Sequence, residues 1–434
     1  MLGGGVAGLA AAARAAEAGA SVTVVEKGPR PGGSAALSAG ILWTAPDHET
    51  MRRVVPGGDP ELGRRLVDGF VPAMEWVRSH GAFVSERWEG QMGFGSACRI
   101  DIAALFEAWR GRIRASGEIL LGTAARRLLV DGGGRVTGAL VGGPTDAREL
   151  RADAVLLATG GFQGDAELRQ TLLGWDADAL LVRSNPWSVG DGFRMGRQAG
   201  AAASRCLGGF YGHLVPSPLA QLRPEHFLPL TQYWSNHAVL VNLLGRRFTD
   251  ESLGDEVSNQ ALLRQPGARG VLLCDHRVRT TCAAAAPYPH GQVVDRIAAA
   301  QAAGGRVARA ATVDALVDAV AGWGVGRRAL CDTLEAHAAA AGGADVALDA
   351  PLPAEPEPLR EPPFHAVEVQ PAITFPFGGL AVDPDGRALD RDGRVVPGLF
   401  AAGADAGGLQ DRRYVGGLVL GLVFGPLAAE AALE

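Results

Sequence analysis

The chain has 434 residues, of which 47% are hydrophobic and 20% are charged. This length is sufficient for two domains, each with a core of its own. The formal net charge of −6 argues against a nucleic-acid partner, because such partners usually require a basic surface. The five cysteines contain no CxxC pair, so we expect neither a disulfide framework nor a metal site. With no basic and apolar leader, these features favour a cytoplasmic protein.

The first thirty residues read as a strand, a glycine-rich turn, a helix and a second strand. The expected helix runs from about residue 7 to 18 and ends at Gly19. The following strand, 21–26, is rich in valine, as is typical of a buried parallel strand. Because only Met1 and Leu2 precede the turn, the first strand is either shortened or begins upstream of this sequence.

Later patterns indicate a second domain inserted into the first. Residues 101–118 favour a helix, and the turn at 131–134 joins two strands into a hairpin. From residue 208 to about 370, prolines, aromatics and histidines increase. We therefore expect an α/β fold: a doubly wound, Rossmann-like domain over 1–208 and 372–434, with an inserted α+β cap domain over 209–371.

The stretch from Tyr414 to Ala429 carries no charged residue. It is shorter than the ~20 apolar residues that a membrane span needs, and glycine and proline interrupt it. We expect a buried helix there and no membrane span.

Gly3, Gly5 and Gly8 form a GxGxxG motif between the first strand and the first helix. Such glycines provide a tight turn, close backbone approach to a pyrophosphate and close packing of helix against strand. Glu26 ends the second strand, where a carboxylate accepts hydrogen bonds from a ribose. The alternative for Glu26 is a surface acid, but the motif favours dinucleotide binding.

The run EKGPRPGGSAALSAG (26–40) resembles the loop that wraps the flavin in the succinate dehydrogenase/fumarate reductase flavoprotein superfamily. LATGGF (157–162) and GLFAAGADAGG…GGLVLG (398–421) resemble the second and third FAD contacts of that superfamily, in the same order. The resemblance implies FAD contacts at Gly3, Gly5, Gly8, Glu26, Lys27, Gly32, Gly33, Ser34, Ser38, Gly40, Ala158, Thr159, Gly160, Gly161, Asp191, Gly403, Asp405, Gly417 and Leu418.

The third block carries the most specific implied roles. By resemblance, Asp405 meets the ribityl chain, and the N–H groups of Gly417 and Leu418 point at the N1/O2 edge of the flavin. A helix N-terminus there favours the anionic reduced flavin. Members with covalent FAD carry a histidine in the loop matching 34–40; this chain has none, so we expect noncovalent FAD.

Three blocks of the inserted domain also resemble this superfamily: GHLVP (212–216), VNLLGRRFTDES (241–252) and PPFHAVEVQPAITFPFGGL (362–380). Fumarate reductases hold their dicarboxylate with two arginines and a histidine. The matching positions here are Asp255, Thr374 or Phe375, and Tyr414. The chain therefore looks closer to the tricarballylate dehydrogenase and ketosteroid dehydrogenase-like branch.

Tyr414, His213 and Asp255 are the candidate catalytic residues. Tyr414 could donate to a substrate carbonyl or take a proton, and its alternative is a packing aromatic. His213 lies where the family holds substrate, and its alternative is a structural histidine. For Asp255 and Glu256 the alternative is a solvated helix start.

Three more charged or titratable residues stand near these blocks. Arg412 and Arg413 either bind a substrate carboxylate or are surface charges. His365 replaces a tyrosine of the family, and we expect it to be structural.

The leading hypothesis is an FAD-dependent enzyme that acts on CH–CH groups. It would dehydrogenate a C–C bond next to a carbonyl or carboxylate, or reduce it, by hydride transfer with flavin N5 and proton transfer by Tyr414 or a cap-domain group. The alternatives are a flavin oxidase of an amine or alcohol, and a catalytically degenerate FAD-binding electron-transfer subunit. Expected partners are a small-molecule substrate and a separate electron acceptor, which is a protein, a quinone or oxygen.

Overall fold

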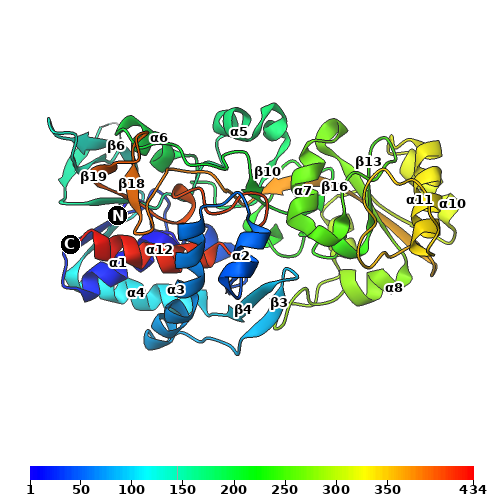
Figure 1. Ribbon diagram of the computed structural model, residues 1–434, viewed down its shortest axis with the longest axis horizontal. Coiled ribbons are helices and arrows are strands. Elements are labelled where there is room, and N and C mark those ends of the chain that lie inside the picture. The colour runs from blue at the N-terminus through cyan, green and yellow to red at the C-terminus, as the bar shows by residue number, and fades with distance from the viewer. Residues whose placement is uncertain (144) are drawn as a thin grey trace. The chain divides into compact units, whose positions relative to one another are not determined.

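The chain folds into two units, each assembled from separate stretches of the sequence (Figure 1). The computed structural model describes residues 1–143 and 145–434. The first unit comprises Met1–Gly174, Ser184–Tyr211 and Phe375–Glu434, and the second comprises Trp175–Arg183 and Gly212–Thr374. The expected α/β fold with an inserted α+β part is confirmed.

A parallel sheet forms the centre of the first unit. Its strands are, in spatial order, β5 (Gly117–Leu120), β1 (Val22–Val25), β9 (Val155–Leu157) and β19 (Val395–Ala401), with β18 (Arg387–Leu389) antiparallel beside β19. Leu2 joins β1 to β9 through parallel bridges to Val25 and Leu157. The first strand expected from the sequence is therefore a single bridging residue, which places the following glycine turn at the centre of the sheet.

Helices cover one face of this sheet, and a small antiparallel sheet covers the other. The helical face is formed by α1 (Val6–Glu17), α3 (Pro60–Ser79), α4 (Ile102–Ser116) and α12 (Leu418–Ala431), which share one hydrophobic core. The opposite core contains residues of β6 (Ala125–Val130), β7 (Val136–Val141) and α6 (Asp191–Gln198). The strand β8 (Arg148–Arg151) extends the sheet of β6 and β7.

The apolar C-terminal helix α12 is buried against α1, as the sequence predicts. A Cβ atom added at Gly425 would lie 2.6 Å from the carbonyl oxygen of Ala7, so glycine lets the two helix backbones approach closely. In the part of the chain that the structure describes, no helix has the length and apolarity of a membrane span.

The remaining elements of the first unit are short. They are η1 (Gly33–Leu37), β2 (Ile41–Thr44), α2 (His48–Val54), β3 (Trp88–Gln91), β4 (Gly95–Arg99), α5 (Ala166–Leu173), β11 (Phe210–Tyr211), β17 (Phe375–Pro376) and η8 (Gly403–Asp405). Strands β2, β4 and β3 form one antiparallel sheet, and β11 pairs with β17.

The second unit is built around the long strand β16 (Phe364–Ile373). It pairs with β10 (Leu181–Val182), β12 (Leu214–Pro216), β14 (Gly270–Cys274) and β15 (Val307–Ala310), and β13 (Val239–Asn242) pairs with β14. The helices are α7 (Asp255–Leu263), α8 (His276–Val278), α9 (Arg296–Ala302), α10 (Val313–Ala321) and α11 (Arg327–Ala341). Short helical turns are η2 (Trp175–Ala179), η3 (Pro224–His226), η4 (Ser235–His237), η5 (Glu251–Leu253), η6 (Pro266–Ala268) and the π-helical η7 (Arg279–Ala283). Two hydrophobic cores, one including Ile297 and the other Leu316, pack against the sheet.

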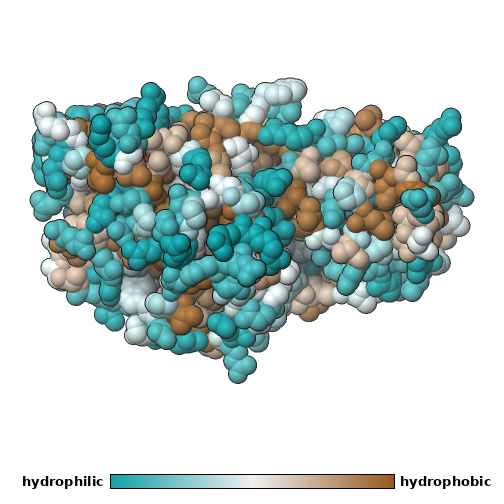
Figure 2. Space-filling model, viewed as in Figure 1, coloured by the Kyte–Doolittle hydropathy of each residue, from teal (hydrophilic) through white to brown (hydrophobic). Residues whose placement is uncertain are grey.

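Hydrophilic residues cover most of the face shown in Figure 2, and hydrophobic residues form small patches among them. This mixture is ordinary for a folded protein surface, because there is not enough polar surface to cover every apolar side chain.

Candidate active site

The glycine turn before α1 has the geometry that a pyrophosphate site requires. A Cβ atom at Gly3 would lie 2.1 Å from the carbonyl oxygen of Ala158, and one at Gly8 would lie 2.0 Å from the carbonyl oxygen of Gly3. Both positions therefore exclude any side chain. Gly5 caps the N-terminus of α1. A Cβ atom added at Gly5 would meet no atom within 4 Å, so the space above the helix end is open. An anion fits there because the helix dipole and unpaired N–H groups favour negative charge.

Glu26 follows β1 and closes this turn from the other side. Its carboxylate accepts hydrogen bonds from the N–H groups of Gly4 at 2.8 Å and Gly28 at 2.6 Å. The side chain is buried, so the alternative of a surface acid is wrong. Each carboxylate oxygen keeps a further lone pair, which is what a ribose hydroxyl needs.

The loop after Glu26 folds back onto the glycine turn. The N–H of Gly32 donates to the carbonyl oxygen of Gly4 at 2.7 Å, and Gly33 has a φ of 54°, in the left-handed region that favours glycine. The Ser38 hydroxyl donates to the Ala35 carbonyl oxygen at 2.7 Å and accepts from the Gly40 N–H at 3.2 Å. The loop is thus held by its own hydrogen bonds beside the open end of α1.

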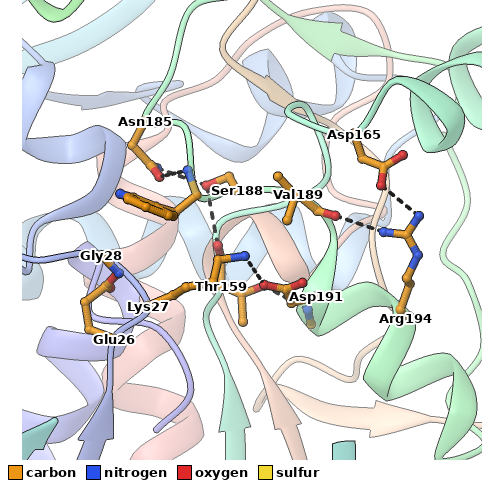
Figure 3. A network of polar contacts seen from close by, with 12 residues as sticks. Glu26, Lys27, Gly28, Thr159, Asp165, Asn185, Ser188, Val189, Asp191 and Arg194 are labelled. Carbon is orange, nitrogen blue, oxygen red and sulfur yellow. Dashed lines mark hydrogen bonds and ion pairs between the residues drawn. The ribbon is translucent and has the colours of Figure 1, made fainter. Parts of the chain in front are cut away.

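A polar network joins this loop to the segment before α6 (Figure 3). The Asn185 amide donates to the Ser34 hydroxyl at 2.8 Å and to the Ser188 hydroxyl at 2.9 Å. Lys27 forms an ion pair with Asp191, the first residue of α6. Sequence reasoning did not single out Asn185 and Ser188. The signal available for them was the run SNPWS (184–188), which stands one residue before Gly190 and Asp191.

Asp405 cross-links two of the FAD blocks predicted from the sequence. Its carboxylate accepts from the Thr159 N–H at 2.5 Å, the Thr159 hydroxyl at 3.1 Å and the Gly161 N–H at 3.1 Å. The side chain is fully buried, and burial raises the pKa of Asp405 while these hydrogen bonds oppose the rise. Ala158, Gly160 and Gly403 belong to the same two turns. Asp405 therefore fixes the shape of the turns that the resemblance assigns to FAD.

Aromatic side chains gather beside the N-terminus of α12. We call Trp43, Phe94, Tyr211, Phe375 and Tyr414 the aromatic cluster. The rings of Tyr211 and Tyr414 are stacked with centroids 3.6 Å apart, and Trp43 meets Tyr414 edge-on at 5.1 Å. The N–H of Gly417, which the family resemblance assigns to the N1/O2 edge of the flavin, donates instead to the Tyr414 hydroxyl at 2.8 Å. Leu418 is the first residue of α12 and is buried.

The two arginines before Tyr414 differ in their surroundings. The guanidinium of Arg413 lies over the Phe94 ring, 5.2 Å from its centroid, and Arg412 is exposed. Arg413 is therefore packed on the aromatic cluster, whereas Arg412 fits the surface alternative.

The Nδ1 of His213 is hydrogen-bonded to the carboxylate of Asp255 in the second unit. Both are buried, and Glu256 is buried as well, so the alternative of a solvated helix start for Asp255 and Glu256 is wrong. Burial lowers the pKa of His213, while the charge of Asp255 opposes this shift. His213 is therefore neutral at neutral pH, and Asp255 is placed to stabilise the imidazolium that would form on proton uptake.

The structure thus collects the residues predicted to bind FAD in the first unit, together with Tyr414. His213 and Asp255 belong to the second unit. His365 lies on β16, is buried, and has a pKa lowered to about 4, first by burial and then by nearby arginines. In the described residues, no group of three or more His, Cys, Asp or Glu is arranged to hold a metal ion.

A family model described as "FAD binding domain" matches residues 1–418. The chain belongs to this family. The open end of α1, the buried Glu26 and the turns held by Asp405 all fit an FAD molecule. The chain is similar to "Fumarate reductase (cytochrome)" of Shewanella frigidimarina, with 27% identity over 465 residues that cover 100% of this chain and 76% of the relative.

A second relative is "4-oxocyclohexanecarboxylate 2-dehydrogenase" of Sinomonas cyclohexanicum. It is 27% identical over 538 residues, covering 98% of this chain and 90% of the relative. Among solved structures, a 3-ketosteroid-Δ4-(5α)-dehydrogenase from Rhodococcus jostii RHA1 shares the fold. Its TM-score is 0.78, with 21% identity and coverage of 100% of this chain and 96% of that one. The predicted family is confirmed, and the chain is an FAD-dependent oxidoreductase acting on CH–CH groups.

Proposed function

We propose that the chain dehydrogenates the α,β C–C bond of a cyclic ketone or keto acid, using noncovalently bound FAD and passing electrons to a separate acceptor. The observation that carries this proposal is the aromatic cluster around Tyr414 at the N-terminus of α12. A relative matched over 98% of this chain and 90% of its own length is named as a dehydrogenase of 4-oxocyclohexanecarboxylate. Aromatic walls suit a ring better than a small dicarboxylate.

The first unit supplies the cofactor site. When bound, FAD supplies hydride transfer. The chain holds its pyrophosphate at the open end of α1 and its ribose at Glu26. The loop 34–40 contains no histidine, which supports a dissociable cofactor. Acid precipitation should release the flavin into the supernatant, and flavin retained in the pellet would contradict noncovalent binding.

The Tyr414 hydroxyl is the group that we assign to the substrate carbonyl. It accepts the Gly417 N–H at 2.8 Å, and a phenol that accepts on its oxygen is also a donor through its own O–H. A hydrogen bond to the carbonyl oxygen stabilises the enolate-like charge that develops when the α-proton leaves. The neutral His213, oriented by Asp255, is the candidate base for that proton.

The test is an anaerobic screen of the purified holoprotein with cyclic ketones, keto acids, enones and fumarate. We expect 4-oxocyclohexanecarboxylate or another cyclic ketone to bleach the flavin. The variant His213→Gln should retain FAD but slow bleaching at least ten-fold. Bleaching by amines or alcohols instead, or by no compound of the ketone panel, would refute the proposed reaction.

A further inference from the structure

A buried arginine without an acidic partner stands out in the second unit. Arg183 directly follows β10, and only 2% of its surface is exposed. Among the residues that the structure describes, no Asp or Glu oxygen lies within 4.0 Å of its guanidinium. Burying an unpaired charge is costly, so an arginine in this state calls for an explanation.

Neutral oxygens fix the guanidinium in one orientation. It donates to the hydroxyls of Thr231 and Thr374, each at 3.0 Å, and to the carbonyl oxygen of Phe227 at 2.7 Å. A longer contact of 3.5 Å reaches the Tyr233 hydroxyl. Arg183 also lies over the Phe227 ring, with its Cζ 3.6 Å from the centroid. These contacts orient the cation without neutralising it, and one N–H on Nη1 remains available.

A second buried arginine, Arg296, lies over the ring of Tyr233. The Cζ of Arg296 is 5.2 Å from the centroid of the Tyr233 ring, and Arg296 is also 2% exposed. Its Nη1 donates to the carbonyl oxygens of Ala285 and Val294, while its buried Nε has no hydrogen-bond partner. Tyr233 therefore stands between two buried cations, and its ring meets His213 edge-on with centroids 5.1 Å apart.

Another buried arginine of the second unit, Arg247, is paired with a carboxylate. Arg247 is 3% exposed, and its Nε donates to the Glu251 carboxylate at 3.0 Å, with a second contact from Nη2 at 2.5 Å. Arg247 therefore has a direct acidic partner. In the part of the chain that the structure describes, Arg183 and Arg296 have no acidic oxygen within 4.0 Å, although Tyr233, which both contact, lies against His213.

We propose that Arg183 is the anchor for a carboxylate of the substrate, and that Arg296 adds to the positive potential around it. This inference rests on the proposed function and deepens it, because it defines the substrate as an anion: a cyclic keto acid rather than a neutral ketone. A carboxylate oxygen can accept the remaining N–H on Nη1, which gives charge neutralisation and one directed, charge-assisted hydrogen bond. Its arrival gives Arg183 the direct acidic partner that it lacks among the described residues.

The test compares two probes that differ in charge and have no CH–CH bond to oxidise, benzoate and benzamide. Calorimetric titration of the wild-type holoprotein should give at least ten-fold tighter binding of benzoate. Arg183→Gln should weaken benzoate binding ten-fold or more and leave benzamide binding within two-fold. Arg328→Gln removes an exposed arginine of the same unit and should change neither.

A purely structural role of Arg183 would change both probes equally. Equal wild-type affinity for the two probes, binding of neither, or unchanged benzoate binding in Arg183→Gln would overturn the anchor. If Arg183→Gln does not fold, Arg183→Lys keeps the charge but loses the fork, and should still weaken benzoate selectively. The two proposals can fail separately. If benzoate binds more tightly than benzamide through Arg183 but no ketone bleaches the flavin, the role of Arg183 in carboxylate binding is upheld and the proposed reaction is refuted.

Discussion

The N–H of Gly417 donates a hydrogen bond to the hydroxyl oxygen of Tyr414, with 2.8 Å between the two atoms. Gly417 caps the N-terminus of α12, so the phenol oxygen lies where the helix dipole is positive. Stacking on Tyr211, with centroids 3.6 Å apart, fixes the ring. A phenol held in this way is a better donor to a carbonyl than a free tyrosine, because negative charge on its oxygen is stabilised.

Tyr414→Phe should therefore retain FAD and slow substrate-driven flavin reduction by ten-fold or more, about 1.4 kcal/mol in the barrier. The ring and its stacking remain in this variant, so the effect isolates the hydroxyl. Stopped-flow bleaching of the flavin at 450 nm, roughly where oxidised flavins absorb, measures the rate. Tyr211→Phe is the matched control, since it changes the neighbouring ring in the same way. A Tyr414→Phe protein as fast as the wild type would remove the hydroxyl from the chemistry.

Glu26 should contribute strongly to FAD affinity. Glu26→Ala loses the acceptors for Gly4 and Gly28 as well as those for the ribose, and each hydrogen bond to a charged group contributes ~1.5–3 kcal/mol. We expect at least a ten-fold rise in the dissociation constant, measured by fluorescence titration of the apoprotein with FAD. Glu75→Gln, at an exposed position of α3, is the control for the change in net charge. Wild-type affinity in Glu26→Ala would mean that the cofactor does not use this carboxylate.

The local part of this site was predictable from the sequence, and the assembled part was not. The glycine turn and Glu26 could be assigned because strand, turn and helix follow one another within thirty residues. The Asn185 contact to Ser34 spans 151 residues, and the Thr374 contact to Arg183 spans 191. Periodicity carries no information about such pairs, since it reports only which face of an element is buried.

Burial also decided questions that residue type left open. Asp255 and Glu256 begin a helix, where acids are usually solvated, yet both are buried in the packed unit. The sequence does not distinguish Arg183 from other arginines, because arginine is common on protein surfaces. Its importance follows from the neutral partners around it, which only the fold reveals.

Two buried histidines should make the stability of the second unit depend on acid pH. The pKa values of His337 and His365 are lowered to about 4, chiefly by burial, and then by nearby arginines. Because folding favours their neutral forms, the stabilisation is fully present above the unfolded pKa of ~6.5 and is lost as the pH falls through about 4. Thermal unfolding of the holoprotein between pH 7 and pH ~4 should show a falling midpoint.

His365→Gln should reduce the size of that fall, because glutamine does not titrate. His48→Gln, at an exposed position of the first unit, should leave it unchanged. A midpoint that stays constant over this range in the wild type would show that the two histidines are not held neutral.

Fumarate should be a poor substrate, although a fumarate reductase is among the similar proteins. Reducing it requires cationic groups for two carboxylates and a positioned proton donor. At the positions expected to supply them, Asp255 is paired with His213, Thr374 accepts from Arg183, and Tyr414 belongs to the aromatic cluster. An aspartate ~4 Å from a substrate carboxylate would cost ~4 kcal/mol at an effective dielectric of ~20.

Arg183 does not reverse this expectation, because one guanidinium neutralises one carboxylate and leaves the second to be buried at the cost of an unpaired charge. The measurement is the reoxidation of photoreduced holoprotein mixed anaerobically with fumarate. We expect a reoxidation rate no faster than in buffer. The control is a cyclic enone carboxylate, the product of the proposed dehydrogenation, which should reoxidise the flavin readily and so show that the reduced protein is active. Rapid reoxidation by fumarate would mean that cations elsewhere in the chain hold the second carboxylate, and that the aromatic cluster does not set the substrate class.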